Sequence, residues 1–344
     1  MINVFLIDDS VLVRNSFKKI LTGLSDIHIL GEANNPVDAF TEFKKVGLPD
    51  VFILDIEMPK MDGLTFLRKI NVQRPTPVIM CSTLVTKGSN ALLEALSLGA
   101  FAIIAKPTVG VSSFINDYKE EVLEYIRTAA KAKVKFSTLA KKSNTINAAK
   151  NFDHKPSSKI IGIGSSTGGV QVIEEILTNL QKDHPPILIV QHMPVGFTNN
   201  FATRLNGLCE NSNVIEAEEG DILKTNRVYI APGDKHMEVF KEGLYFVIRL
   251  KDFPKVDFHK PSITVFFTSI SKIAKENATA FVLTGMGVDG ASGLLKMRNV
   301  GSKTYCQNEQ TCTVYGMPKA AVTAGAVLSE LSIFDITKTI NGTR

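Results

Sequence analysis

The sequence predicts two α/β domains, each built on a doubly wound, mostly parallel sheet, with a linker between them. Two observations favour this fold class. Strand and helix signals alternate along both halves of the chain, and polar residues follow several of the apolar strand signals. The chain has 344 residues, too many for one typical domain. We expect domains over residues 1–124 and 158–344, joined by a linker over 125–157.

Short apolar, β-prone runs recur through the first domain, with amphipathic stretches between them and after the last. The predicted strands lie near residues 2–7, 27–32, 51–55, 77–81 and 101–105. The last amphipathic stretch predicts a helix over about 112–128. Five strands that alternate with helices indicate a parallel sheet covered on both faces.

The predicted linker is rich in Lys, Ala, Ser and Asn and lacks a sustained apolar period. Such a composition cannot bury a core. Much of the net charge of +5 arises between Arg127 and Lys159. A basic stretch of this kind is usually a solvated segment, and the rest of the chain has no nucleic-acid-binding motif. We therefore expect no nucleic-acid partner.

The second domain begins with a strand signal over 160–164, followed by a helix from Gly168 to about Leu180. Shorter strand signals between 213 and 250, separated by Gly and Pro, predict a hairpin insertion. The other predicted elements are strands at 187–190, 280–283, 303–307 and 326–329, and helices near 261–275, after Asp289 and from Pro318.

Composition limits the class of protein and its expected location in the cell. Hydrophobic residues make up 44% and charged residues 21%, as in soluble globular proteins. No apolar run reaches the length of about 18 residues that a membrane span requires, and the start of the chain lacks a signal-peptide pattern. We expect a cytoplasmic protein that is not inserted in a membrane. Four cysteines without a CxxC pattern predict reduced, packed thiols: Cys81, Cys209, Cys306 and Cys312.

Charged residues stand at the ends of three strand signals in the first domain. Asp8 and Asp9 follow the first, Asp55 closes the third, and Lys106 follows the fifth. An Asp after a strand is usually a turn or helix-cap residue. Parallel strands would, however, bring all four side chains to one sheet edge, where ligands bind. Clustered carboxylates suit Mg²⁺, and the arrangement can accept a phosphoryl group on a carboxylate.

By spacing and order, residues 1 to about 124 resemble a bacterial response-regulator receiver domain, which has a flavodoxin-like fold. The resemblance implies that Asp55 accepts the phosphoryl group. It implies Mg²⁺ bound by Asp8, Asp9, Asp55 and the backbone carbonyl of Glu57, and phosphoryl contacts from Ser82 and Lys106. Many receivers carry an aromatic switch residue three positions before the lysine. Here that position is Ile103, so we expect no aromatic switch there.

A second candidate site begins at the turn Gly164–Gly169, between a strand and a helix. The turn matches a nucleophile elbow with Ser166 at its centre. A serine attacks only when a base takes its proton. His192 ends the neighbouring strand signal, and Asp289 follows a further strand. These residues form a candidate Ser-His-Asp triad.

Other interpretations remain open from the residues alone. The glycines of Gly162-x-Gly164-x-x-x-Gly168 also suggest a dinucleotide loop, although the acidic residue expected about 20 positions on is replaced by Gln191 and His192. His236 and His259 are rival candidates for the base. A non-catalytic adaptor or nucleic-acid-binding regulator that uses the basic linker is a further alternative.

Several longer segments, in order, resemble the catalytic domain of the chemotaxis protein-glutamate methylesterase. They are Gly164 to Gly169, Gln191-His192-Met193-Pro194, Ala231 to Met237, Leu283 to Gly287 with Asp289-Gly290, Gln307-Asn308-Glu309 and Tyr315-Gly316-Met317-Pro318. In that family a receiver precedes the esterase, so the resemblance covers nearly all of the chain. It implies Ser166 as nucleophile, His192 as base, Asp289 as orienting acid, and the backbone N–H of Met286 as an oxyanion donor.

The resemblance also implies the activity. We expect a phosphorylation-activated serine hydrolase that removes γ-methyl esters from glutamates of membrane chemoreceptors, and deamidates particular glutamines. A chemotaxis histidine kinase would supply the phosphoryl group. Mg²⁺ would serve the receiver alone, and the esterase would need no cofactor.

Overall fold

The computed structural model describes residues 1–82, 90–106, 111–132, 152 and 154–343. Backbone contacts divide the chain into two compact units, Met1–Thr138 and Leu139–Arg344. Residues 133–151, most of the predicted linker, lie outside the described residues.

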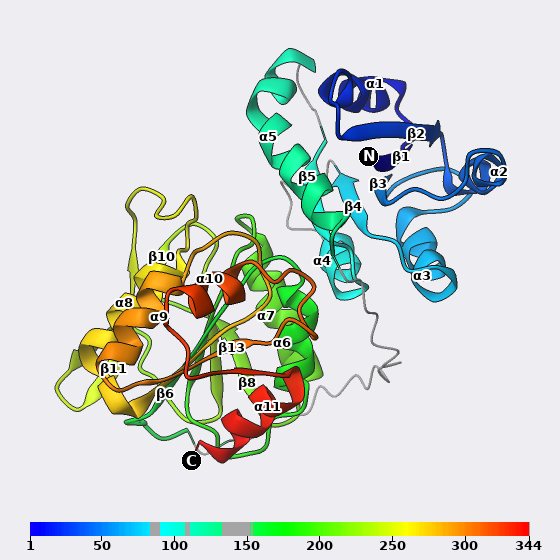
Figure 1. Ribbon diagram of the computed structural model, residues 1–344. Helices are drawn as coiled ribbons and strands as arrows, with labels where there is room; N and C mark the ends of the chain where they lie inside the picture. Colours follow the sequence, from blue (N-terminus) through cyan, green and yellow to red (C-terminus); the bar gives the residue numbers. More distant parts are fainter. Residues whose placement is uncertain (83–89, 107–110, 133–151, 153, 344) are drawn as a thin grey trace. The chain divides into compact units, whose positions relative to one another are not determined.

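The first unit contains a five-stranded parallel sheet in the order β2-β1-β3-β4-β5 (Figure 1). The strands are β1 (Ile2–Ile7), β2 (Ile27–Ala33), β3 (Val51–Asp55), β4 (Val78–Ser82) and β5 (Ala102–Ala105). This order is that of flavodoxin-like folds, in which ligands bind beyond the carboxyl ends of the strands. The predicted fold class of the first domain is confirmed.

Five helices connect and follow these strands. They are α1 (Val11–Leu21), α2 (Pro36–Val46), α3 (Gly63–Gln73), α4 (Asn90–Ser97) and α5 (Val111–Ala129). Side-chain oxygens of Ser10, Asn35 and Asp62 cap α1, α2 and α3. Such polar residues satisfy N–H groups that the first helical turn leaves unpaired.

The helix α5 continues past residue 124, where the sequence prediction placed the domain boundary. Val122 and Ile126 are fully buried, and Arg127 Nε pairs with Asp26 Oδ2 at 2.7 Å. These contacts hold the last turns of α5 against the first unit, and α5 packs beside α1.

The second unit contains a seven-stranded parallel sheet in the order β14-β13-β12-β6-β7-β9-β8. Its strands are β6 (Ile160–Ser165), β7 (Ile187–Gln191), β8 (Asn213–Glu216), β9 (Arg227–Ile230), β12 (Ala278–Val282), β13 (Lys303–Gln307) and β14 (Ser329–Leu331). An antiparallel hairpin, β10 (His236–Glu242) with β11 (Tyr245–Lys251), lies between β9 and the next helix. The predicted parallel sheet and a hairpin insertion are confirmed. The insertion is shorter than predicted, because β8 and β9, whose strand signals were assigned to it, pair in parallel within the main sheet.

Helices cover both faces of this sheet (Figure 1). They are α6 (Gly169–Thr178), α7 (Phe197–Leu208), α8 (Ile263–Ile273), α9 (Ala291–Asn299), α10 (Met317–Thr323) and α11 (Ile333–Gly342), with a short 3₁₀ turn, η2 (Lys275–Asn277). α8, α9 and α10 form one layer, and α6 contacts α7 and α11 in the other. Neither α7 nor α11 is among the helices predicted from the sequence.

The glycines of β6 have a packing role. A side chain at Gly162 would press on Phe267 and Ile270 of α8, and one at Gly164 would overlap Ile263. These glycines therefore let α8 lie directly on the sheet. The first two glycines of the pattern that suggested a dinucleotide loop are thus explained by contact between helix and strand.

The end of the predicted linker lies along the second unit. Pro156 forms a β-bridge with Lys224, and His154 Nδ1 lies 2.9 Å from the carbonyl oxygen of Thr225.

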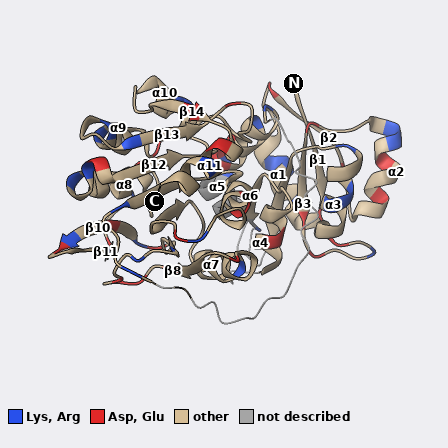
Figure 2. Ribbon diagram, turned by 90° about the horizontal axis from the view of Figure 1, so that it is seen from below, with Lys and Arg blue, Asp and Glu red and all other residues tan. Residues whose placement is uncertain are grey.

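Charged residues and thiols lie in different parts of the fold. Figure 2 shows Lys and Arg interspersed with Asp and Glu on the helices, as on α2. The four cysteines are buried, and no disulfide joins them, as predicted. Among the described residues, no helix is both long and apolar enough to span a bilayer.

Candidate active site and phosphoacceptor site

Three adjacent strands of the second unit carry the predicted triad. β6 lies between β7 and β12, with Ser165 opposite Gln191 and Gly164 opposite Val282. Ser166 follows β6 directly, and His192 follows β7. The backbone N–H of His192 donates to the carbonyl oxygen of Ser165 at 3.0 Å. Parallel register therefore brings both residues to the same carboxyl edge of the sheet.

The turn after β6 holds Ser166 in place. Its backbone N–H donates to the carbonyl oxygen of Thr284 at 3.0 Å, and its carbonyl oxygen accepts from Gly169 N–H at 2.8 Å. Gly168 adopts φ +79°, and a side chain there would run into Thr313. The half-buried Ser166 thus stands at the N-terminus of α6, where the helix dipole favours negative charge.

The neighbouring hydroxyl, that of Ser165, has a structural role. It is fully buried and donates to Gln191 Oε1 at 2.5 Å. Gln191 Nε2 in turn donates to the carbonyl oxygens of Ser166 (3.0 Å) and His192 (3.1 Å). Gln191 therefore ties the two site loops together, a role that sequence reasoning missed.

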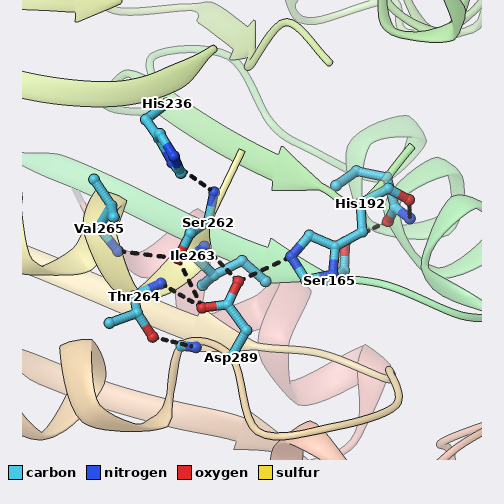
Figure 3. A network of polar contacts seen from close by, with 10 residues as sticks. Ser165, His192, His236, Ser262, Ile263, Thr264, Val265 and Asp289 are labelled. Atoms are coloured by element: carbon cyan, nitrogen blue, oxygen red, sulfur yellow. Dashed lines mark hydrogen bonds and ion pairs between the residues drawn. The ribbon is translucent and has the colours of Figure 1, made fainter. Parts of the chain in front are cut away.

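Asp289 is almost completely buried, at 1% exposure, and is held by the first turn of α8 (Figure 3). Its Oδ1 accepts hydrogen bonds from Ser262 Oγ (2.9 Å) and Thr264 N–H (2.9 Å). Its Oδ2 accepts from Ile263 N–H (2.7 Å) and lies 2.9 Å from His192 Nε2. Each oxygen of the carboxylate thus has two hydrogen-bond partners.

These partners decide the charge of Asp289. Burial alone raises the pKa of the carboxyl group, but the His192 hydrogen bond and the N–H groups of Ile263 and Thr264 outweigh it and lower the pKa to about 2. Asp289 is consequently ionised at neutral pH and can only accept hydrogen bonds.

The ionised carboxylate fixes the tautomer of His192. Because Asp289 only accepts, Nε2 must carry the imidazole proton. The basic lone pair is then on Nδ1, which is buried and has no hydrogen-bond partner among the described residues. In this structure the Ser166 hydroxyl therefore does not reach Nδ1. The site holds a base whose acceptor nitrogen lacks a donor.

The two rival histidines have other positions. His236 Nδ1 accepts from the backbone N–H of Ser262 at 3.1 Å, and its Nε2 lies 3.1 Å from the carbonyl oxygen of Pro254. With both ring nitrogens bonded to backbone, His236 is a structural residue. His259 stacks on His192, with ring centroids 3.7 Å apart and planes 16° apart.

The loop after β12 passes beside Ser166. A Cβ at Gly285 would lie 2.8 Å from Ser166 Cβ, and Gly285 N–H donates to the carbonyl oxygen of Val314 at 3.1 Å. The half-buried Met286 comes next in this loop. The peptide that precedes Met286 is therefore a neighbour of the serine.

The carboxylates predicted in the first unit also converge. Asp8, Asp9 and Asp55 each offer an oxygen, and these oxygens lie within 4.8 Å of one another. Lys106 Nζ lies 2.7 Å from Asp55 Oδ2 and 3.0 Å from Asp8 Oδ2. Asp8 and Asp55 are buried, whereas Asp9 is exposed. The strand order β1-β3-β4-β5 brings these side chains to one edge.

Charge in this cluster is only partly balanced. Burial raises the pKa of Asp55 to about 6, although Lys106 opposes the shift. Three ionised carboxylates and one ammonium leave two formal negative charges uncompensated. All the side-chain atoms that could bind a metal ion here are carboxylate oxygens. Such a donor set fits a hard divalent cation such as Mg²⁺.

The other predicted receiver residues flank the cluster. Ser82 ends β4 and is buried, and its carbonyl oxygen accepts from the backbone N–H of Lys106 at 3.0 Å. Glu57 is exposed just beyond β3, and Ile103 is half-buried in β5.

The fold and the sites define the class of protein: a flavodoxin-like domain with an acidic cluster, followed by an α/β domain with a serine, a histidine and an aspartate near one sheet edge. Comparison with known proteins agrees. The family described as CheB methylesterase matches residues 161–340, and the response regulator receiver domain matches residues 4–112. The chain belongs to the CheB methylesterase family and carries a receiver domain ahead of the methylesterase domain.

Relatives match along the whole chain. A protein-glutamate methylesterase/protein-glutamine glutaminase of Leptospira interrogans is 44% identical, over 98% of each chain. That of Escherichia coli is 42% identical, over 98% of this chain and 95% of its own. The crystal structure of the Thermotoga maritima CheB methylesterase catalytic domain is 36% identical, with a TM-score of 0.53; the match covers 55% of this chain and all of that one.

Proposed function

We propose that the chain hydrolyses γ-methyl esters of glutamate side chains in proteins, with Ser166 as nucleophile, His192 as base and Asp289 as orienting acid. One observation carries the proposal. The hydrogen bond between His192 Nε2 and Asp289 directs the only basic nitrogen of the imidazole, Nδ1, away from the carboxylate. A hydroxyl group is the partner that this nitrogen lacks, and Ser166 lies at the same sheet edge.

The reaction proceeds by acyl transfer. A rotation of the Ser166 side chain brings its hydroxyl to His192 Nδ1, which takes the proton as Oγ bonds to the ester carbonyl carbon. The imidazolium then protonates the departing methoxide, so that methanol leaves and a glutamyl ester of Ser166 remains. Water then attacks the glutamyl ester in the same way, with His192 again as base, and this step frees the glutamate and the Ser166 hydroxyl. Asp289 stays ionised throughout and stabilises the imidazolium.

The negative oxygen of the tetrahedral intermediate needs donors nearby. The backbone N–H of Met286 is our assignment, because the peptide before it lies against Ser166. The N-terminus of α6 adds its dipole. An amide carbonyl forms the same kind of intermediate, so we assign glutamine deamidation to this site as well. The names of the relatives, which give both activities, support that assignment.

The substrates we assign are methylated glutamates in the cytoplasmic regions of membrane chemoreceptors, in keeping with the chemotaxis family. In this scheme residues 1–124 receive the signal, 158–344 carry the esterase and 125–157 join them. A chemotaxis histidine kinase is the phosphodonor.

Asp55 is the proposed phosphoacceptor. Asp8, Asp9, Asp55 and the backbone carbonyl of Glu57 would hold Mg²⁺, which supplies positive charge for the incoming phosphoryl oxygens when it is bound. Lys106 already lies beside Asp55 and would contact a phosphoryl oxygen, with Ser82 contacting another. Phosphorylation of Asp55 then raises esterase activity.

Methanol release from methyl-labelled receptor membranes tests the proposal. Ser166→Ala should abolish release while phosphorylation of Asp55 continues. Ser329→Ala, at an exposed serine of β14, should release methanol like the unmodified protein. Asp55→Asn should keep basal release and lose activation by acetyl phosphate. Methanol release that survives Ser166→Ala would mean that the nucleophile is another residue.

A further inference from the structure

The imidazole of His259 lies flat on that of His192. Their centroids are 3.7 Å apart and their planes differ by 16°. His259 is half-buried and belongs to the segment before α8, whereas His192 follows β7. The Asp289 hydrogen bond lies at the edge of the His192 ring, so the stack restrains a different motion, rotation out of the ring plane.

A tight turn presents His259 to the site. The backbone N–H groups of Val256 and His259 each donate to the other residue's carbonyl oxygen, at 3.1 and 3.0 Å. Between them, Asp257 and Phe258 both have positive φ, 51° and 68°. This is the conformation of a type I′ turn, which usually takes Asn or Asp followed by Gly. Asp257 suits the first position, but Phe258 stands where Gly is usual, which indicates strain that the surroundings maintain, often at functional sites.

Packing of Phe258 does not stabilise this turn, because Phe258 is 91% exposed. What the turn places against the site is His259, stacked on His192. We propose that His259 is a positioning residue: its neutral ring holds the His192 ring in the plane that joins Asp289 to Ser166, and stabilises the imidazolium that forms during acyl transfer. The inference rests on the function proposed above.

The physical basis is the π face of a neutral ring. A cation above such a face is attracted by the ring quadrupole, most strongly where water is excluded. His192 becomes cationic only while it holds the Ser166 proton, so the attraction favours the transition state over the resting enzyme. A second cation at this distance would instead repel the developing charge.

The charged groups around His259 are consistent with a neutral ring. Burial, followed by the proximity of His192, lowers the pKa of His259 to about 4; Asp289 opposes this shift and Lys255 adds to it. His259 is therefore uncharged at the pH values where an imidazole base works.

Three variants of the full-length protein separate this role from simple packing. His259→Phe keeps a flat aromatic ring, His259→Leu removes it, and Phe258→Leu changes the exposed neighbour in the same turn. Methanol release from methyl-labelled receptor membranes is measured from about pH 5 to about pH 9, with the ring-proton chemical shifts of His192 followed by NMR. A ring stacked on another shifts its protons, and this signal does not depend on turnover.

We expect His259→Phe and Phe258→Leu to stay within about twofold of the unmodified protein. His259→Leu should lower kcat by about 3- to 30-fold with little change in KM, and move the acid limb of the rate profile to lower pH. The stacked-ring shift of His192 should persist in His259→Phe and vanish in His259→Leu.

Two results would overturn the inference: a kcat and acid limb in His259→Leu that match the unmodified protein, or a loss in His259→Phe as large as that in His259→Leu. If His259→Leu fails to fold, His259→Phe still tests the inference: a large loss of kcat, or loss of the stacked-ring shift of His192, would overturn it. Persistent methanol release in Ser166→Ala would instead defeat the proposed function, while the NMR signal would still show whether His259 orients His192.

Discussion

Asp289 Oδ2 and His192 Nε2 lie 2.9 Å apart, although 97 residues separate them in the sequence. The contact crosses from the loop after β12 to the end of β7, with β6 and its serine between. It leaves Nδ1 as the basic nitrogen, whereas the chymotrypsin-like triad uses Nε2 for the serine. The two ring nitrogens have thus exchanged places relative to that triad. One nitrogen still donates to the carboxylate, and the other still serves as the base.

Asp289→Asn should lower kcat for methanol release by about 10³- to 10⁴-fold. An amide no longer requires a proton on Nε2, so the neutral imidazole can place its proton on Nδ1, where it blocks abstraction from Ser166. The ester assay on receptor membranes measures the effect. Asp335→Asn, an exposed aspartate in the first turn of α11, is the control. A tenfold loss or less would argue that Asp289 only fills space.

Ser262→Ala should lower the free energy of unfolding by about 2 kcal/mol. The hydroxyl both donates to Asp289 Oδ1 and accepts from Val265 N–H as the cap of α8. Ser332 caps α11 in the same manner, accepting from Asp335 N–H, and it also donates to Asp335 Oδ2, but that carboxylate is exposed and lies outside the site. Ser332→Ala should therefore cost about 1 kcal/mol and leave activity intact. Urea unfolding compares the two, and equal costs would show that the Asp289 contact contributes nothing.

Both sites were predictable in part because parallel strands end together. Asp8, Asp55, Ser166 and His192 follow apolar runs directly, so strand register alone brings each to a sheet edge. The position of Asp289 is harder to predict, because this residue lies seven residues beyond β12 in an irregular loop.

The supporting contacts could not be predicted. Ser262 and Thr264 contact Asp289 only because α8 lies on β6, which depends on the tertiary fold. Gln191 resembles any strand-end residue until its amide partners are known.

The two missed helices had signals. Phe197, Phe201 and Leu205 recur at a spacing of four residues and are fully buried in α7. Ser332 with Asp335 three residues later is a helix start. Both helices are short amphipathic segments that lie outside the stronger motifs.

Gly285→Ala should abolish the esterase and lower the free energy of unfolding by about 2 kcal/mol or more. The added methyl would lie 2.8 Å from Ser166 Cβ and overlap Met317 Sδ, so the serine must move. Gly207→Ala in α7 is the matched control, since a Cβ there meets nothing within 4 Å and alanine favours a helix. Thermal unfolding measures the stability of both variants, and the methanol assay measures their activity. An active Gly285→Ala protein would mean that the loop after β12 yields easily.

Mg²⁺ should stabilise the first unit, and more so as the pH rises through about 6. A cation needs ionised carboxylates, and burial holds the pKa of Asp55 at about 6. At lower pH protons compete for the same oxygens. Thermal unfolding with and without millimolar MgCl₂ should show a larger rise in Tm at about pH 7.5 than at about pH 5. Asp55→Asn should remove most of the rise, and Asp50→Asn, an exposed aspartate outside the cluster, should keep it. Equal shifts at both pH values would contradict the cluster as the binding site.

The stability of the second unit should fall as pH drops from about 6.5 to about 4. Burial and His192 lower the pKa of His259 from 6.5 to about 4, so in this window the unfolded chain binds a proton that the folded chain does not, and protons favour unfolding. His259 alone should account for about 2 kcal/mol between pH 7 and pH 4.5. The depressed pKa of Asp289 acts at lower pH, between about 4 and about 2.

His236 and His184, whose pKa values burial also lowers, add to the same slope. Hydrogen-exchange mass spectrometry reports each unit separately and can follow this change in the full chain. In His259→Phe the ring cannot titrate, so the slope over this window should become shallower by the His259 share while the remaining two histidines keep it positive. A slope that His259→Phe leaves unchanged would show that His259 is protonated in the folded protein as readily as in the unfolded chain, and that the ring stacked on His192 carries charge below about pH 6.5.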